Sequence, residues 1–507
     1  MGVRHASALV IAVALLSACI IRSTSISQVS TAQPGPVTTP ARLHLLDGSI
    51  ALVRSPWTIA RDTVLGSFAV YDPRLQLTDS LRALPLDRVA GIETYIAKTN
   101  SGASIGASVL ATGVAALGTA ALAVAIFGSC PTVYSDSAGV ERLESEGFSY
   151  SLAPLLEARD VDLLRARPGA DGRIRLTVRN EAAETHYINH IELLAVQHAD
   201  SEAVAPDATG LPLALGGWVS YRATDRDGRN AVATLAEADS LVYASDSASF
   251  NPADTTRLHD WISITLPAID ADSVAILLRA RNSLFTTVLL YDQMLARRGA
   301  HAVDWIGRDL ANIGSVLALS RWYSAELGMH LQVRDGAAWR DAARLGDPGP
   351  IAWEETAVVV PVRRRVPNTV RLWFPTDAWR IDRVRVAANF RRPRWRAIAA
   401  ESLRDPRGIE QDSLRAQIAE ADDAYLVTQP GDAFTVEFPT RSADDGDQFL
   451  LAMQGYYIEW IRPAWAARPD AGPFMPGNDV LRHTLERWQQ QRNLFEQRFF
   501  GSRLAVR

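Results

Sequence analysis

The sequence predicts a mainly β protein with helical insertions, and three patterns support this class. Runs in which apolar and polar residues alternate recur through the chain, as in Ile174, Leu176 and Val178, and a period of two is typical of strands with one buried face. Asp47-Gly48 between apolar runs is a two-residue hairpin signal. A unit made of a strand, a proline and a second apolar strand also recurs, which favours stacked antiparallel sheets.

The chain begins with the features of an export signal. Arg4 precedes an uninterrupted apolar stretch over 8–16, and small residues then lead to Cys19. Leu16-Ser17-Ala18-Cys19 resembles the lipobox of bacterial lipoproteins. The resemblance covers only the beginning of the chain, and it implies removal of residues 1–18, acylation of the Cys19 thiol and attachment to a membrane lipid. Ile20 stands where an acidic residue would favour the inner membrane, so the resemblance implies the outer membrane.

Two segments follow the cysteine. Residues 19–41 contain no charge after Arg22 until Arg42 and no hydrophobic period, so we expect a flexible tether. Residues 42–99 contain several short strand patterns, and we expect a small antiparallel β module there.

Residues 100–129 form an apolar segment rich in alanine and glycine, long enough to cross a bilayer as a helix. Small residues recur on its expected faces, and such residues let helix backbones approach closely. Those assigned to helix packing are Gly102, Ala103, Gly106, Ala107, Ala111 and Ala115. Three interpretations remain open: the helix spans a membrane, it joins copies into a homo-oligomer, or it is buried in the core.

The rest of the chain predicts two β-sandwich-like domains, at 130–283 and 328–470, separated by a helical segment at 284–327 and followed by a C-terminal helix at 471–507. The recurring unit is interpreted as one hairpin used three times. The first strand of each copy ends at a proline, which is Pro267, Pro375 or Pro439. The C-terminal helix carries an apolar stripe that we expect to pack on the body.

One group of residues could hold a metal ion. His186 and His190 lie four residues apart near Glu184 and Glu192, and residues two or four apart in a strand share a face. The alternative is a set of hydrogen-bonded or exposed histidines on a sheet, and we favour it. Accordingly, no metal or other cofactor is expected.

A second group could bind anions. Between Arg363 and Arg396 the chain has eleven arginines against two aspartates, and arginine beside indole rings suits phosphates or acidic sugars. The candidate residues are Arg363, Arg364, Arg365, Arg391, Arg392, Arg394 and Trp395. Internal pairing with the acids of 401–447 is the alternative that we favour. Trp322-Tyr323 and the group Trp373, Trp379 and Trp395 could stack on sugar rings, although sandwich tryptophans commonly pack in cores.

Several activities lack their required residues. Lys98 is the only lysine, and it lies in no phosphate-binding loop, acyl-enzyme motif or kinase motif. Gly102 to Gly106 matches the letters of a nucleophile elbow, but a long alanine-rich segment is the wrong context. A net charge of -5 gives no indication of nucleic-acid binding. Cys130, the only cysteine besides Cys19, is interpreted as a buried apolar side chain.

These observations favour a non-enzymatic, lipid-anchored protein of the cell envelope, facing the periplasm or the cell surface. Its sandwich domains would bind an envelope glycan, another envelope component or a partner protein. The first alternative is a membrane-embedded assembly component that uses the helix at 102–128 in the inner membrane. The second is a metal-dependent envelope enzyme. No catalytic residue is predicted.

Overall fold

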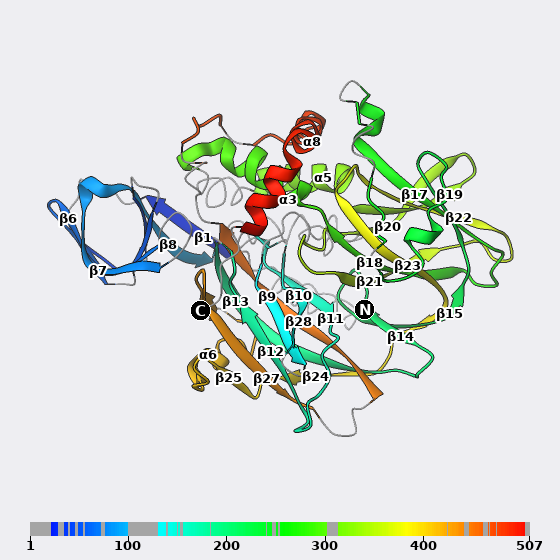
Figure 1. Cartoon of the computed structure of the whole chain (residues 1–507), viewed down its shortest axis with the longest axis horizontal. Helices are drawn as coiled ribbons and strands as arrows, with labels where there is room; N and C mark the ends of the chain where they lie inside the picture. Colours follow the sequence, from blue (N-terminus) through cyan, green and yellow to red (C-terminus); the bar gives the residue numbers. More distant parts are fainter. Residues whose placement is uncertain are drawn as a thin grey trace, which may run out of the picture.

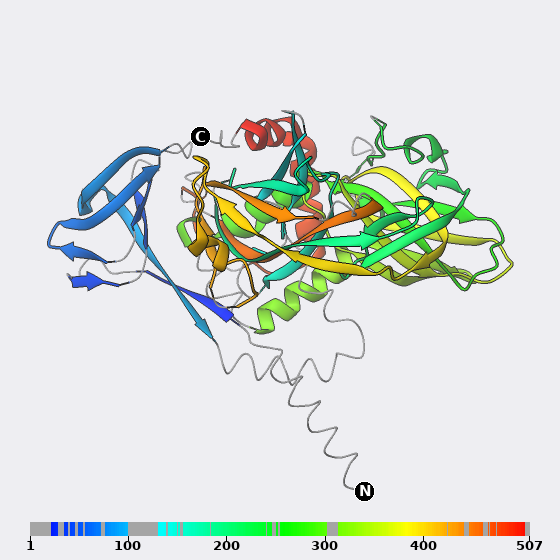
Figure 2. The ribbon, with the colours of Figure 1, turned by 90° about the horizontal axis from the view of Figure 1, so that it is seen from below.

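The computed structural model describes residues 22–501 apart from a set of internal gaps. The gaps are 29–34, 39–40, 46–48, 54–55, 72–76, 100–129, 138–139, 150, 153–155, 183, 240, 246–249, 252–253, 302–312, 423, 441–445, 460–464, 466 and 473. Within this part of the chain the strands form five antiparallel sheets, and helices are few. The predicted class, mainly β with helical insertions, is confirmed. Figures 1 and 2 show three bodies in a row: a small module, a central pair of sheets and a second pair of sheets.

The small module at one end is a strongly curved sheet whose strand order is β1-β8-β3-β4-β6-β5-β2, with β7 beside β6 (Figure 1). Its interior holds Leu43, Trp57 and Phe68, all fully buried. Its strands are β1 (Arg22–Gln28), β2 (Gly35–Val37), β3 (Ala41–Leu45), β4 (Ile50–Val53), β5 (Trp57–Ala60), β6 (Thr63–Tyr71), β7 (Leu77–Pro85) and β8 (Val89–Thr99). β3 and β4, on either side of the predicted hairpin turn, pair antiparallel.

The module begins earlier than the sequence predicts. The expected tether over 19–41 contains β1 and β2, which pair with β8 and β5. Both are at the ends of the strand order. Edge strands are held by backbone hydrogen bonds on one side and need no apolar period, so a polar sequence can form them.

The central body, here called the first sandwich, consists of two five-stranded sheets. One sheet contains β9 (Thr132–Ser137), β10 (Val140–Glu146), β12 (Arg173–Arg179), β25 (Ser402–Arg404) and β27 (Ala433–Pro439). The other contains β11 (Ala158–Leu163), β13 (Glu184–Gln197), β24 (Trp395–Ala399), β26 (Leu426–Thr428) and β28 (Asp447–Glu459). Leu176 of the first sheet and Leu193 of the second belong to one buried core.

The distal body, here called the second sandwich, also has two five-stranded sheets. Sheet D contains β14 (Ala203–Pro206), β15 (Pro212–Val219), β18 (Ser273–Asn282), β21 (Glu354–Pro361) and β23 (Trp379–Arg391). Sheet E contains β16 (Arg222–Asp225), β17 (His259–Leu266), β19 (Met329–Asp335), β20 (Ala338–Leu345) and β22 (Asn368–Pro375). Ile264 of sheet E and Ile276 of sheet D both point into the buried core.

The two sandwiches are nested along the chain, which differs from the predicted sequential domains at 130–283 and 328–470. β13 pairs with β24 and β28, so segments before 198 and after 394 build one body. The second sandwich is formed wholly by the segment between them. Alternation shows which face of a strand is buried but not which strand is its neighbour, and this explains the error.

The recurring unit is not a hairpin. β17 lies in sheet E while β18 lies in sheet D, so the chain crosses between layers at Pro267. β17 pairs with β22, and β18 pairs with β23. In the first sandwich β12 pairs with β27 and β13 with β28 in the same manner. Each sandwich is therefore built around two such crossing units that lie side by side.

The main helices lie together along one side of the sandwiches, at the top of Figure 1. They are α3 (Leu284–Val288), the π-helix η8 (Leu289–Leu295), the 3-10 helix η9 (Ala296–His301), α5 (Ile313–Glu326) and α8 (Asn478–Gly501). Shorter helices are η1 (Leu86–Arg88), η5 (Val232–Thr234), η7 (Thr255–Leu258) and α6 (Asp412–Ala416). α8 packs on the body through fully buried Leu481, Leu485 and Trp488, as the sequence predicts.

A buried carboxylate joins the two sandwiches. Glu146 at the end of β10 accepts hydrogen bonds from the backbone amides of Ile351 at 2.6 Å and Ala352 at 2.8 Å. Gly349 in the same loop has φ +68, and a Cβ there would lie 2.9 Å from the Glu146 carboxylate. Only glycine combines that backbone conformation with so close an approach.

Among the residues described, no helix combines the length and apolar character that crossing a bilayer requires. The segment 102–128, with its predicted packing residues, lies outside the described residues, as does Cys19.

Candidate functional site

The outward face of sheet E carries three tryptophans. Ile262 and Ile264 of β17 point into the core, so Trp261 points outward, where it lies opposite Trp373 of β22. Trp339 of β20 lies on the same face, and all three rings are partly exposed. Large aromatic side chains at the solvent-facing positions of a strand cost solubility unless they contact a partner.

Two arginines alternate with these rings. The guanidinium of Arg226 lies 4.6 Å from the centre of the Trp261 ring, and that of Arg371 lies 5.2 Å from the same centre. Arg371 also lies 4.4 Å from the centre of the Trp339 ring. Cation–π contacts of this kind hold the rings and cations in a fixed arrangement. We call the set of Trp261, Trp339, Trp373, Arg226 and Arg371 the tryptophan face.

Histidines complete one end of this face. The His259 ring stacks on Trp373 with centroids 3.9 Å apart, and His330 meets the same indole edge-on at 4.8 Å. Burial lowers the pKa of His259 to about 4 and also lowers that of His330. Both rings are therefore neutral at physiological pH and act as flat packing groups beside Trp373.

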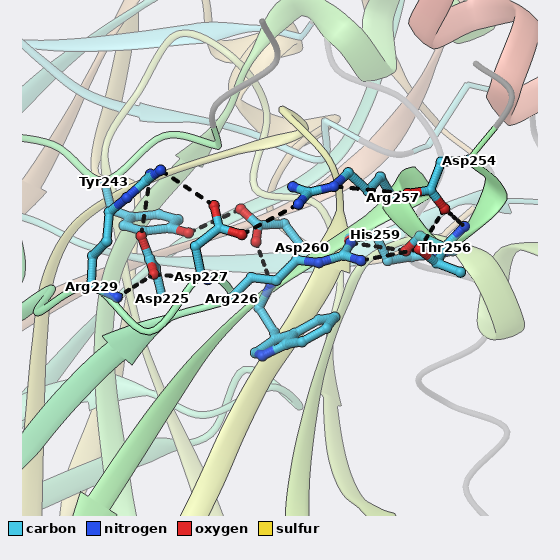
Figure 3. A network of polar contacts seen from close by, with 11 residues as sticks. Asp225, Arg226, Asp227, Arg229, Tyr243, Asp254, Thr256, Arg257, His259 and Asp260 are labelled. Carbon is cyan, nitrogen blue, oxygen red and sulfur yellow. Dashed lines mark hydrogen bonds and ion pairs between the residues drawn. The ribbon is translucent and has the colours of Figure 1, made fainter. Parts of the chain in front are cut away.

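A polar pocket adjoins the tryptophan face and shares Arg226 with it. Figure 3 shows its charged side chains, most of them from the turn after β16 and from the segment that precedes β17. The polar residues that line it are Asp225, Arg226, Asp227, Arg229, Tyr243, Ser245, Arg257, His259, Asp260 and Thr376. Dashed lines in Figure 3 join the acids and arginines at its mouth.

The ion pairs at the mouth of the pocket are loose. Arg257 lies 3.4 Å from Asp227 and 3.9 Å from Asp254, and Arg229 lies 3.6 Å from Asp227. Charge-assisted hydrogen bonds in proteins are typically about 2.7–2.9 Å. These side chains consequently keep donor and acceptor capacity for a polar ligand.

The floor of the pocket is rigid by contrast. The Tyr243 hydroxyl donates to Asp260 at 2.9 Å, and the other oxygen of Asp260 accepts the backbone amide of Trp261 at 2.7 Å. Burial raises the pKa of Asp260 and that of Tyr243. Since both carboxylate oxygens are occupied, Asp260 fixes the start of β17 and thereby the position of Trp261.

The predicted anion-binding arginines are mostly neutralised within the protein. Arg364 and Arg365 pair with Asp270, Arg391 pairs with Glu202, and Arg392 pairs with Asp207. These partners come from 202–270 and not from the acids of 401–447. Arg363 and Arg394 have no ion pair within the part of the chain that is described. Trp395 is 46% exposed on the first sandwich.

The two histidines proposed as metal ligands do not meet. β13 has a bulge between Ile188 and His190, and Ile188 and Ile191 on either side of it both face the core. The extra residue shifts the alternation by one, so His186 faces inward and His190 outward. His186 is fully buried against Glu184, and burial lowers its pKa to about 3. No cluster of metal-ligating side chains occurs among the described residues.

The tryptophans considered for sugar stacking divide into two groups. Trp379 is fully buried, and Trp322 and Tyr323 are less than 9% exposed, so these rings pack in the core. Trp373 lies on the tryptophan face. Sequence reasoning did not identify Trp261 or Trp339. The sequence did contain a signal for Trp261. Ile262 and Ile264 mark the buried face of this strand, so Trp261 falls on the opposite face, where polar residues are expected.

No family model and no curated protein matches the sequence. Among solved structures, the chain aligns with a GH31 alpha-xylosidase from Xanthomonas citri at 9% identity and a TM-score of 0.14, covering 86% of this chain and 34% of that one. It aligns with an arabinofuranosyltransferase from Mycobacteria at 10% identity and a TM-score of 0.11, covering 96% of this chain and 39% of the other. The chain thus spans less than two fifths of the length of either structure.

Proposed function

We propose that this chain is a lipid-anchored protein of the bacterial cell envelope that binds a glycan through the tryptophan face and polar pocket of its second sandwich. The proposal is a binding role without catalysis. The single observation that carries it is the outward display of Trp261, Trp339 and Trp373 on one sheet face.

The chemistry of the face suits a sugar. A pyranose ring has flat surfaces of C–H groups, and the electron-rich face of an indole attracts such groups. Its hydroxyls both donate and accept hydrogen bonds, so they can use the guanidiniums and carboxylates of the loose ion pairs at Arg257 and Arg229. Aromatic rings for stacking and charged groups for hydroxyls occur here side by side.

The anchor rests on the lipobox-like segment that ends at Cys19. Replacement of Cys19 by serine should abolish incorporation of labelled palmitate and release the protein from the membrane fraction. Incorporation that persists in this variant would contradict the anchor and leave glycan binding to be judged separately.

Glycan binding is tested with the double variant Trp261→Ala and Trp373→Ala. The probes are peptidoglycan sacculi, lipopolysaccharide and capsular polysaccharides, and binding is measured by affinity electrophoresis and by quenching of tryptophan fluorescence. We expect the unaltered protein to bind at least one of them and the double variant to bind about tenfold more weakly or worse. Trp395→Ala is the matched control, because Trp395 is exposed on the other sandwich. Equal binding by the unaltered and doubly altered proteins would refute the role of this face.

A further inference from the structure

The tryptophan face carries a group of arginines. Four arginines point outward from sheet E or its adjoining turn, and none has a carboxylate within ion-pair distance among the described residues. Register and burial place them there, because each neighbours a strand position that faces the core. They are Arg222, Arg226, Arg334 and Arg371.

The one outward acid on these strands is already used. Asp341 accepts hydrogen bonds from His330 at 2.9 Å, Gln332 at 2.8 Å and Arg344 at 3.0 Å. Arg344 thus neutralises Asp341. Within the described part of the chain, the four arginines of the face have no such ion pair, whereas Arg383 of sheet D pairs with Glu355.

Arg371 is the central member. It lies between the Trp261 and Trp339 rings and makes its hydrogen bond to the amide oxygen of Gln332, at 2.8 Å. Burial lowers the pKa of Arg371, and the more distant Asp341 offsets this only in part. The guanidinium has lost part of its water without gaining a hydrogen bond to a carboxylate. An anion that arrives with the ligand would supply the missing partner, and a guanidinium binds such groups with two parallel hydrogen bonds.

We propose that the glycan bound by the tryptophan face is acidic, and that Arg371, between Trp261 and Trp339, binds the carboxylate or sulfate of one of its sugars. The inference rests on the proposed function and specifies its ligand class. The occupant is a polysaccharide chain and not a lipid surface, because none of the large apolar side chains exposed in the described part of the chain lies on β16, β17, β19, β20 or β22. A membrane-binding face would need such side chains to enter the acyl region.

The test compares polymers that differ only in charge. Polygalacturonate and dextran sulfate are the acidic probes, and fully methyl-esterified polygalacturonate and dextran are their uncharged counterparts. The intact protein should bind an acidic polymer at least tenfold more tightly than its counterpart, and this preference should decrease as salt rises. Arg371→Gln should remove the preference, with a loss of about tenfold or more for the acidic polymer.

Two controls separate charge from folding. Arg364→Gln changes an arginine whose charge is already paired with Asp270, and it should bind as the unaltered protein does. Arg371→Lys retains the charge but not the fork, and it should keep part of the preference. Unchanged thermal midpoints in all three variants would show that the fold is intact.

The outcomes distinguish the two proposals. If Arg371→Gln leaves binding to every polymer unchanged while the Trp261 and Trp373 variant abolishes it, glycan binding stands and the acidic ligand is refuted. If no polymer is bound and the tryptophan variant alters no glycan interaction, the proposed function itself fails. Binding to vesicles containing phosphatidylglycerol but to neither acidic polymer would refute the polysaccharide and assign the face to a membrane.

Discussion

Trp488 near the C-terminus donates its indole N–H to the carboxylate of Asp377 at 2.6 Å, across 111 residues of chain. Both side chains are fully buried. Asp377 lies in the connection between β22 and β23 with φ +60, a conformation that few non-glycine residues adopt. Arg380 also pairs with Asp377 at 2.7 Å. The last helix thus holds a strained turn of the second sandwich in place.

Replacing Trp488 by phenylalanine should destabilise the protein. The ring would still fill the site, but the buried carboxylate would lose one donor, which costs about 1–3 kcal/mol. Urea unfolding followed by far-UV circular dichroism measures the change. Trp395→Phe, at an exposed ring, should leave the midpoint unchanged. Equal midpoints for Trp488→Phe and the unaltered protein would contradict the role of this bond.

Asp347 should make a contribution to stability that falls as the pH rises from 4 to 7. Burial raises the pKa of Asp347 from 3.8 to about 6, although Tyr323 and Asn282 donate to it. The folded state then binds this proton more tightly than the unfolded state does. Its stabilising contribution is complete below about pH 3.8 and is lost as the pH passes about 6.

Asp347→Asn removes that titration and tests the assignment. Between pH 4 and 7 the free energy of unfolding of this variant should improve relative to the unaltered protein by up to about 3 kcal/mol. Denaturant unfolding at several pH values gives the difference. Parallel curves over this range would show that Asp347 does not contribute.

The junction between the sandwiches should depend on Glu146. Glu146→Ala would leave the amides of Ile351 and Ala352 without their acceptor in a buried place, at a cost of about 3 kcal/mol. Protease cleavage near 346–353 should also become faster. Asp171→Ala removes an acid from an exposed ion pair with Arg175 and should change little. A Glu146 variant as stable and as protease-resistant as the Asp171 variant would count against this junction.

Cys130 should be unreactive in the folded protein. Its thiol is 3% exposed, and burial together with Glu146, 3.0 Å away, raises its pKa well above the ordinary value. In a Cys19→Ser background, Ellman's reagent should detect no thiol under native conditions and one thiol in guanidinium. Adding Val140→Cys, at a position that is 69% exposed, provides a reactive control. Rapid native labelling of Cys130 itself would contradict its placement.

The fold class could be predicted from the sequence because alternation is local. In β17, for example, every second residue is buried, and the sequence shows this directly. The pairing of strands could not be predicted, because β12 and β27 are joined by contacts between residues about 260 positions apart. Nothing in the period of either strand specifies that partner.

The candidate site illustrates the same limit. Trp261, Arg371 and Trp339 come from three strands, and their alternation exists only once sheet E is assembled. The bulge after Ile188 places His186 and His190 on opposite faces of β13. It could not be predicted, because a single extra residue in a strand does not change the composition of the sequence. The arginine-rich stretch could be recognised in the sequence, but most of its candidate anion-binding arginines form ion pairs within the protein.

The nested arrangement makes the second sandwich a single insertion between two paired strands of the first. Val196 lies opposite Trp395, and the amide of Gln197 donates to the carbonyl of Arg394 at 2.9 Å, so the chain leaves and returns at adjacent points of two paired strands. Everything between those points occupies the place of an ordinary hairpin turn. A short turn there would keep the strand order of the first sandwich, but not its surroundings, since Glu146 and Trp488 both bind residues of the inserted segment.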